Sequence, residues 1–250
     1  MPNLMEMIRN RRNRESLYCT PEYWDSKTDI HQDHSVSMWP NNHLNHFYHT
    51  EVLDNIERYL PDVKNKFILD VGCGTGRLSR YFAGKEAKVL GFDFSTKSID
   101  IAKKQSQREN PAYRVQSVFE LTDEQAYDII VAWGTVTIAC QNKQELLQVL
   151  KRLYAALKKG GQILLMEPIH KGFLHRVLNM DIKEFCQIME DAGFHIQEVR
   201  HLHCWPFRLG LAFWNWPQWL TAVGYYAGEL ILLLTRHRAL GDYKSIFATK

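Results

Sequence analysis

Short apolar runs alternate with stretches of helical periodicity from residue 67 onward. Seven runs predict buried strands, over residues 67–71, 87–93, 112–118, 127–133, 162–168, 194–202 and 242–250. Apolar residues recur at helical spacing between them, over residues 77–84, 95–108, 142–158 and 181–192. Ser95 is suited to cap the second of these helices. The alternation predicts an α/β fold, a doubly wound parallel sheet of seven strands with helices on both faces.

The segment before residue 61 does not follow this alternation. Residues 1–16 are polar and rich in arginine, which is typical of a flexible arm. Apolar residues then follow helical spacing from Asn42 until Pro61 stops the pattern. We expect residues 1–60 to form an N-terminal arm and a helical cap.

Residues 205–240 also fall outside the repeating unit. Residues 209–228 contain no charged side chain, and four tryptophans fall within fifteen residues. The length would permit a membrane span, but Pro217, Gln218 and Glu229 argue against one. The pattern favours an apolar helical hairpin that lies at a membrane interface or covers an apolar substrate. A pair of helices packed on the domain, or a dimer surface, are the alternatives.

Composition narrows the function classes. The chain has 250 residues, 45% of them hydrophobic and 24% charged, so it can bury a core. A formal net charge of +3 does not call for nucleic acid as a partner. The five cysteines form no CxxC pair, and no apolar stretch follows the basic N-terminus. We therefore expect free thiols and a cytoplasmic location.

The strand at 67–71 runs into a glycine-rich turn that indicates a ligand site. Gly72, Gly74 and Gly76 let the backbone turn sharply and approach a ligand closely. Asp93 ends the next strand, where a carboxylate can accept both hydroxyls of a ribose. A dinucleotide fingerprint requires a small residue where Arg77 stands, so a nicotinamide-dependent oxidoreductase is the second choice.

The G-x-G-x-G spacing after Asp70 resembles motif I of the class I S-adenosylmethionine-dependent methyltransferases. The later segments YDIIVAW, LKKGG and ILLMEP agree in order, so the resemblance covers residues 50–200 and the last strand. It implies a Rossmann-like methyltransferase domain over residues 61–204 and 241–250, with S-adenosyl-L-methionine as cofactor. The residues it assigns to the cofactor are Asp70, Gly72, Gly74, Gly76, Asp93, Phe94, Ser117 and Trp133.

One of these assignments departs from the family's common pattern, and another concerns the methyl acceptor. Ser117 stands where the family often has an acidic residue for the adenine amino group, and Trp133 ends the strand on the substrate side. In similar enzymes the segment before motif I covers the cofactor, which suggests that role for Tyr23 and Trp24, although both could simply pack on the sheet edge.

The acceptor is predicted from what the sequence lacks. After residues 127–133 there is no Asn/Asp-Pro-Pro-Tyr/Phe tetrad, which disfavours methylation of nucleic-acid bases. We expect a small-molecule or lipid-like acceptor, methylated at oxygen, with His170, His43 or His46 as general base. The spacing of the helical histidines does not converge on one ion, so no metal is expected. A catalytically silent, methyltransferase-like binding protein is the alternative from a different class.

Overall fold

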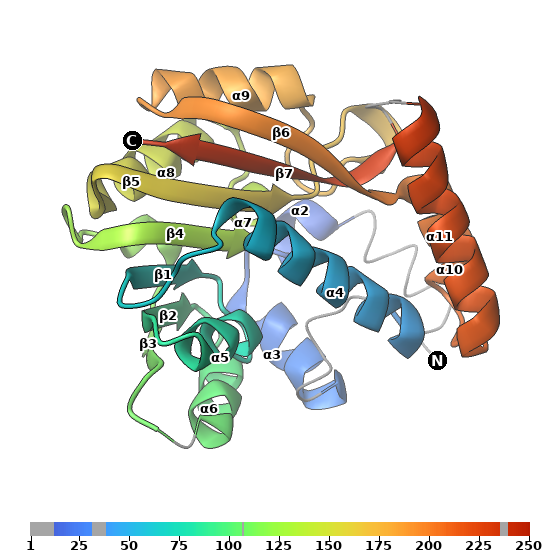
Figure 1. Ribbon diagram of the computed structural model, residues 1–250, viewed down its shortest axis with the longest axis horizontal. Helices are drawn as coiled ribbons and strands as arrows, with labels where there is room; N and C mark the ends of the chain where they lie inside the picture. Colours follow the sequence, from blue (N-terminus) through green and yellow to red (C-terminus); the bar gives the residue numbers. More distant parts are fainter. Residues whose placement is uncertain (1–12, 32–38, 107, 236–239) are drawn as a thin grey trace.

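The computed structural model describes residues 13–31, 39–106, 108–235 and 240–250. The strands of this part form one seven-stranded sheet in the order β3-β2-β1-β4-β5-β7-β6 (Figure 1). Their bounds are β1 Phe67–Val71, β2 Lys88–Asp93, β3 Ala112–Val115, β4 Tyr127–Trp133, β5 Leu157–Glu167, β6 His195–Cys204 and β7 Gly241–Thr249. The α/β fold class is confirmed. One detail differs: β7 lies antiparallel between β5 and β6, so the sheet is mixed and not fully parallel.

Helices cover both faces of this sheet. Their bounds are α2 Arg14–Leu17, α3 Pro21–His31, α4 Asn42–Tyr59, α5 Arg77–Gly84, α6 Thr96–Gln105, α7 Val136–Ala139, α8 Lys143–Ala156, α9 Ile182–Asp191, α10 Trp205–Leu211 and α11 Gln218–Thr235. The N-cap predicted at Ser95 is present, because the Ser95 hydroxyl accepts a hydrogen bond from the Ser98 N–H at the start of α6. The helix predicted over 142–158 ends at Ala156, because Leu157 is already paired with Tyr127 in the sheet.

The third strand is shorter than predicted. It stops at Val115, and Val118–Glu120 forms a short 3-10 helix in place of the strand's last residues. Ser117 caps this turn through the Phe119 N–H, while the Glu120 carboxylate accepts from the Ser117 N–H. Local hydrogen bonding by serine therefore competes successfully with strand pairing at this edge of the sheet.

Alternate residues of the central strands point into two separate apolar layers. In β4, Ile130 packs with the α8 and α9 side, and Ile129 with the side of α4 and α5. In β5, Leu165 and Leu164 divide in the same way. This alternation explains why the runs read as continuously hydrophobic, since both faces of each strand are covered.

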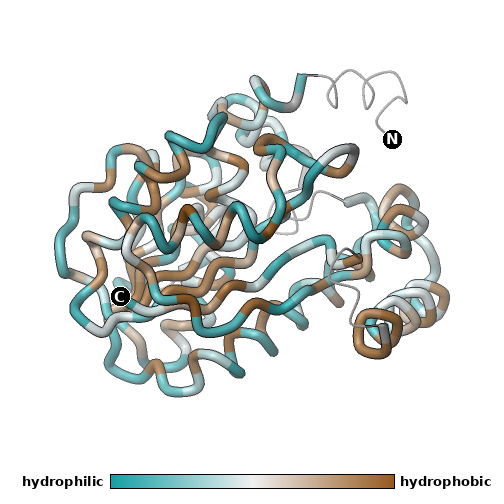
Figure 2. The backbone as a smooth tube through the Cα atoms, turned by 90° about the horizontal axis from the view of Figure 1, so that it is seen from above, coloured by the Kyte–Doolittle hydropathy of each residue, from teal (hydrophilic) through white to brown (hydrophobic). Residues whose placement is uncertain are grey.

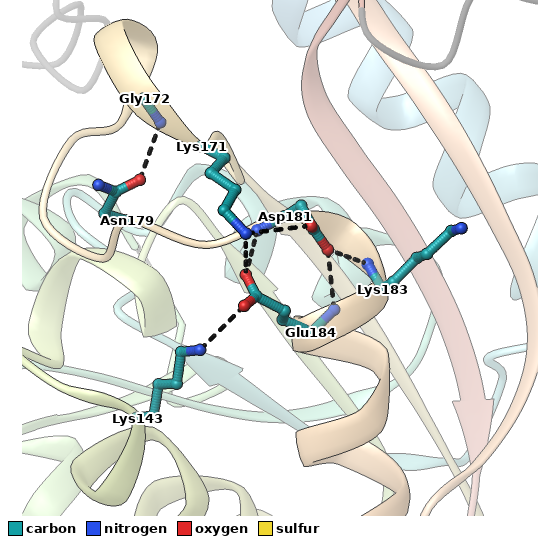
Figure 3. Close-up of polar contacts among 7 residues, drawn as sticks. All are labelled: Lys143, Lys171, Gly172, Asn179, Asp181, Lys183 and Glu184. Carbon is teal, nitrogen blue, oxygen red and sulfur yellow. Dashed lines mark hydrogen bonds and ion pairs between the residues drawn. The ribbon is translucent and has the colours of Figure 1, made fainter.

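Polar side chains set the starting point of α9 (Figure 3). Asp181 accepts hydrogen bonds from the N–H groups of Lys183 and Glu184, and the Glu184 carboxylate accepts from the Asp181 N–H. Lys143, from the first turn of α8, approaches the same carboxylate at 3.1 Å. This reciprocal pair is a capping box, and it fixes the loop that precedes α9.

The segment at 205–240 forms α10 and α11, which stand beyond one end of the sheet and meet the N-terminal part of α4 (Figure 1). Leu211 and Ala212 form a small core with Leu44 and Tyr48 of α4. Asn41, the N-cap of α4, donates to the Leu211 carbonyl and to Thr221 Oγ1. The helical cap and the apolar insertion are therefore packed together. Residues 1–12, most of the predicted arm, lie outside the described residues.

Within the described ranges, each helix is too short or too polar to cross a bilayer. The second helix of the insertion nevertheless exposes a row of large apolar side chains. They are Trp219, Val223, Tyr226, Leu230, Leu233 and Leu234, each between 52% and 75% exposed. Figure 2 shows hydrophobic segments both in the central strands and in the helices at this end of the molecule.

Candidate active site

The glycine-rich turn after β1 leaves no room for a side chain at Gly72 or at Gly76. Gly72, Gly74 and Gly76 have φ values of 66°, 53° and 80°, in the left-handed region. A Cβ on Gly72 would lie 2.2 Å from Thr135 Oγ1, and one on Gly76 would lie 2.3 Å from Tyr113 Oη. Both conformation and space therefore require glycine. Gly72 and Gly74 line a cavity, whereas Gly76 caps α5 outside its wall.

Asp93 joins the ends of the first two strands. Its Oδ2 accepts a hydrogen bond from the Gly74 N–H at 2.9 Å, and its Oδ1 accepts from the Ser95 N–H at 2.9 Å. Burial raises the pKa of this carboxyl, while the backbone donors oppose that effect. Asp93 lines the cavity, and each of its oxygens retains a second lone pair for a hydroxyl donor.

Asp70 lies behind the turn and not in the wall of the cavity. The Ser79 hydroxyl donates to its Oδ2 at 2.5 Å, and the side chain is buried. Burial raises the pKa of Asp70 to about 6, although Ser79 opposes the shift. The geometry gives this residue a structural position, in which it ties α5 to β1.

The cavity has a volume of about 530 Å³, within the range of small-molecule sites. Most of the residues predicted for the cofactor line it: Gly72, Gly74, Asp93, Phe94, Ser117 and Trp133. Trp24 of α3 also lines it, and its indole N–H donates to the Tyr18 carbonyl at 2.8 Å. A segment far ahead of the glycine turn therefore forms part of the wall.

One part of the cavity wall is aromatic, and sequence reasoning missed most of it. Trp39, Tyr48 and Tyr243 line this region together with Trp133. Tyr243 Oη accepts a hydrogen bond from Arg176 Nη1 at 3.0 Å, and burial raises the pKa of this phenol. These residues come from the loop before α4, from α4 and from β7, so only the folded topology brings them together.

Glu167, the last residue of β5, holds the loop after β4. Its two oxygens accept hydrogen bonds from the N–H groups of Thr135, Val136 and Thr137, and from the Thr137 hydroxyl. Burial raises the pKa of Glu167, and these four donors lower it. The buried carboxylate thereby fixes Thr135 against Gly72 at the floor of the cavity.

The predicted general bases take other positions. His170 is buried and its Nε2 lies 3.0 Å from Asp242 Oδ1, and burial lowers the pKa of the imidazole. His46 is exposed and His43 half-buried on α4. Within the described residues, none of the three lines the cavity. The hypothesis that one of them is the base therefore has no support from their position.

Asp242 links His170 indirectly to the aromatic region. It forms ion pairs with Arg208 Nε at 2.8 Å and Arg176 Nη2 at 3.4 Å. The same two guanidinium groups lie over the ring of Trp39. Burial opposes ionisation, but the arginines and His170 hold the pKa of Asp242 well below its usual value. The cluster is a support for Trp39 and Tyr243.

Comparison with known proteins agrees with this geometry. Residues 68–161 match the family model described as "Methyltransferase domain". A ubiquinone biosynthesis O-methyltransferase of Coxiella burnetii is 26% identical over 169 residues, which cover 58% of this chain and 70% of the relative. A demethylmenaquinone methyltransferase of Lactococcus lactis is 30% identical over 157 residues, covering 53% of this chain and 61% of the relative.

Solved structures share the fold at lower identity. Magnesium protoporphyrin IX methyltransferase of Synechocystis, solved with bound cofactor, has a TM-score of 0.60 and 14% identity, covering 96% of this chain and 97% of the other. The strand order with an antiparallel β7 accompanies the glycine turn and the acidic end of β2. Residues 68–161 thus match a methyltransferase family, and the fold around them is that of the class I S-adenosylmethionine-dependent methyltransferases.

Proposed function

We propose that this protein methylates an oxygen atom of a small, lipid-like acceptor that carries a ring hydroxyl. The observation that carries the proposal is that one cavity has two kinds of wall. Gly72, Gly74 and Asp93 line one region of it, and Trp39, Tyr48 and Tyr243 line another. Such a wall suits a polar nucleoside beside a flat apolar molecule.

The residues present fit the cofactor. Gly72, Gly74 and Asp93 line the cavity. The glycines would allow the methionine portion to approach the backbone, and Asp93 would accept hydrogen bonds from the ribose hydroxyls. Phe94 and Ser117 would then form the wall around the adenine. Asp70 and Gly76 act from behind the wall, by fixing the turn and the start of α5. When bound, the cofactor supplies an electrophilic methyl group on a sulfonium.

The chain's own contribution is positioning and hydrogen bonding. Because Arg176 donates to Tyr243 Oη, the phenolic O–H of Tyr243 stays available as a donor. Burial raises the pKa of Tyr48 well above its usual value, so Tyr48 also remains a protonated donor. Two donors in the aromatic region would stabilise an ionised acceptor oxygen and hold it in line with the methyl group. An acceptor that ionises readily, such as a phenol or an enol, needs no histidine base.

Relatives support an apolar ring as the acceptor. The names of two of them place those proteins in ubiquinone biosynthesis and in the methylation of demethylmenaquinone. The first name specifies methylation at oxygen and the second names no atom, so the site of methylation is the finer part of the proposal. The aromatic region with its two phenols favours oxygen, because a phenolate is the species that these donors stabilise.

We further propose that the acceptor is taken from a lipid surface. The exposed apolar row of α11 contains Trp219 and Tyr226, residue types enriched where proteins meet lipid headgroups. This helix packs on α4, which carries Tyr48 of the cavity wall. A membrane contact on α11 would therefore be one helix away from the aromatic region, where we propose that the acceptor binds; we call it the acceptor region.

The direct test is a transfer assay with the cofactor labelled in its methyl group. The acceptors would be a catechol and a hydroxyquinone, each with and without an isoprenoid tail. We expect label in the organic phase and a methoxy signal in the NMR spectrum of the product. A product methylated at carbon, or no transfer to either acceptor class, would contradict the proposed reaction.

A further inference from the structure

Three titratable side chains meet in the interior, beyond the wall of the cavity. Glu51 comes from α4, His203 from β6 and Glu229 from α11. One ligand atom of each lies within 4.8 Å of the others, and the His203 side chain has no solvent exposure. Three elements distant in sequence therefore bring an imidazole and two carboxylates to one point.

Hydrogen bonding within this Glu51–His203–Glu229 cluster is incomplete. His203 Nδ1 lies 2.6 Å from Glu51 Oε2, and the Tyr225 hydroxyl donates to the same oxygen at 2.7 Å. His203 Nε2 and Glu229 Oε1 are both buried and have no hydrogen-bond partner among the described residues. Unsatisfied buried polar atoms are costly, so Glu229 Oε1 calls for a further ligand. Nε2 points away from Nδ1 across the ring, so an ion bound beside Glu51 would use Nδ1 of His203.

The charge balance points the same way. Two carboxylates face one imidazole, and the exposed Arg200 is the cation that acts on both of them. Without a further cation, the cluster must hold a proton between its carboxyl groups to avoid an uncompensated buried charge.

We propose that Glu51, His203 and Glu229 bind one divalent transition-metal ion. Imidazole nitrogen together with carboxylate oxygen suits Zn²⁺ and its neighbours, whereas Mg²⁺ and Ca²⁺ prefer all-oxygen sites. Ligand atoms on a tetrahedral zinc ion stand roughly 3.4 Å apart, because each bond is about 2.1 Å long. To reach this spacing, His203 Nδ1 and Glu51 Oε2, now 2.6 Å apart, would move apart as the ion enters between them. The other ligand atoms already lie within 4.8 Å of one another.

The position of the cluster gives the ion a structural role. It would join the helical cap, the sheet and the apolar insertion at one point. The ring of His203 stacks on Tyr48 with centroids 3.5 Å apart and planes at 3°, and Tyr48 lines the cavity. An ion held by His203 would therefore fix the orientation of a residue in the acceptor region without touching the acceptor.

The test is metal binding by the full chain, produced without an affinity tag and stripped with a chelator. Calorimetry with ZnCl₂, supported by elemental analysis after dialysis, should give one tightly bound zinc per chain and a rise in Tm. Excess Mg²⁺ should not displace it. Less than about one tenth of an equivalent of zinc on the wild-type chain would overturn the proposal, and a shared proton would then explain the cluster.

Matched variants locate the bound ion. Glu229→Gln keeps the size of the side chain, and His203→Asn suits a backbone with φ of 57° at this position. Both should lose tight zinc binding, at least tenfold in affinity, while circular dichroism shows an intact fold. Glu190→Gln changes an exposed residue of α9 and should bind zinc like the wild type. Equal zinc binding by Glu229→Gln and the wild type would place the ion elsewhere and overturn the assignment.

Discussion

Asp93 is bonded through both carboxylate oxygens to backbone N–H groups of two different turns. It therefore shapes the glycine turn as well as facing the cavity. Asp70, only one strand away, has lost contact with the cavity because Ser79 and the start of α5 lie around it. Two acidic residues at neighbouring strand ends thus differ in role because of what covers them.

Replacing Asp93 by Asn should weaken cofactor binding. The amide keeps the shape of the side chain but loses charged hydrogen bonds to the ribose, each worth about 1.5–3 kcal/mol. We expect the Kd for S-adenosylhomocysteine to rise roughly 10- to 100-fold in calorimetry. Asp100→Asn, on the exposed side of α6, is the control and should bind normally. Unchanged affinity in the Asp93 variant would refute the ribose assignment.

Tyr243→Phe tests the hydrogen-bond donor in the acceptor region. Loss of one bond to a developing phenolate should lower kcat about 10- to 100-fold, with little change in KM for the cofactor. Tyr154→Phe removes a hydroxyl from α8, outside the cavity wall, and should leave kcat unchanged. Equal kcat values for Tyr243→Phe and the wild type would remove Tyr243 from the mechanism.

At the scale of elements, the sequence predicted the starts of the helices best, and α5, α6, α8 and α9 begin within one residue of the expected positions. Ser95, Asn142 and Asp181 each cap the helix that follows, because short polar side chains satisfy the first free N–H groups. The shortened β3 and α8 were not foreseen, since local capping by Ser117 and pairing of Leu157 depend on neighbours in space. The sequence left two positions open for Trp24, over the cofactor or packed on the sheet edge, and the structure has it in the wall of the cavity.

The capping box of α9 should contribute measurable stability. Asp181→Ala should lower the free energy of unfolding by about 0.5–2 kcal/mol, measured by urea titration. Lys183→Ala keeps the backbone donor of the same turn and serves as the control. The pKa of Glu184 is lowered from 4.5 to about 2. The largest cause is the hydrogen bond from the Asp181 N–H, and the second is the hydrogen bond from Lys143. This part of the stability is therefore present above pH 4.5 and is lost as the pH falls toward about 2.

The exposed row of α11 should bind lipid. Leu233→Ser combined with Leu234→Ser removes two side chains that are 75% and 72% exposed, so the fold should tolerate the change. We expect the wild type to sediment partly with anionic liposomes at low salt, and the double variant to sediment at least threefold less. Val115→Ser, on the exposed β3 edge, is the control. A wild type that stays in the supernatant would refute lipid contact by α11.

At the scale of the whole molecule, apolar runs predicted the place of each strand and glycine spacing predicted the turn, but neither predicted the order of the strands in the sheet. No feature within residues 241–249 indicates that the last strand lies antiparallel between β5 and β6. The same holds for the aromatic wall, where Tyr48 and Tyr243 are distant in sequence and meet through that topology. Spacing along the chain could predict residues for the cofactor because they follow two consecutive strands, and most of them line the cavity. It could not identify the acceptor region, whose residues come from separated elements.

The interlocking of the helical cap with the insertion also belongs to this scale. Asn41 bonds to Leu211 and Thr221, and the ring of Phe47 stacks on Tyr225 at 4.9 Å. The predicted units 1–60 and 205–240 thus share contacts that sequence separation concealed. Point substitutions on the exposed side of α11 are for that reason better probes than deletion of the insertion.

The most direct test is calorimetry of the wild-type protein with S-adenosylhomocysteine and, separately, with NAD⁺. One cavity lined by Gly72, Gly74 and Asp93 should bind the demethylated cofactor at one site per chain. At a hundred times its Kd, this ligand should raise the free energy of unfolding by about 2.7 kcal/mol, while NAD⁺ should give no heat of binding. Saturable binding of NAD⁺, or no binding of S-adenosylhomocysteine, would contradict the assignment of this cavity.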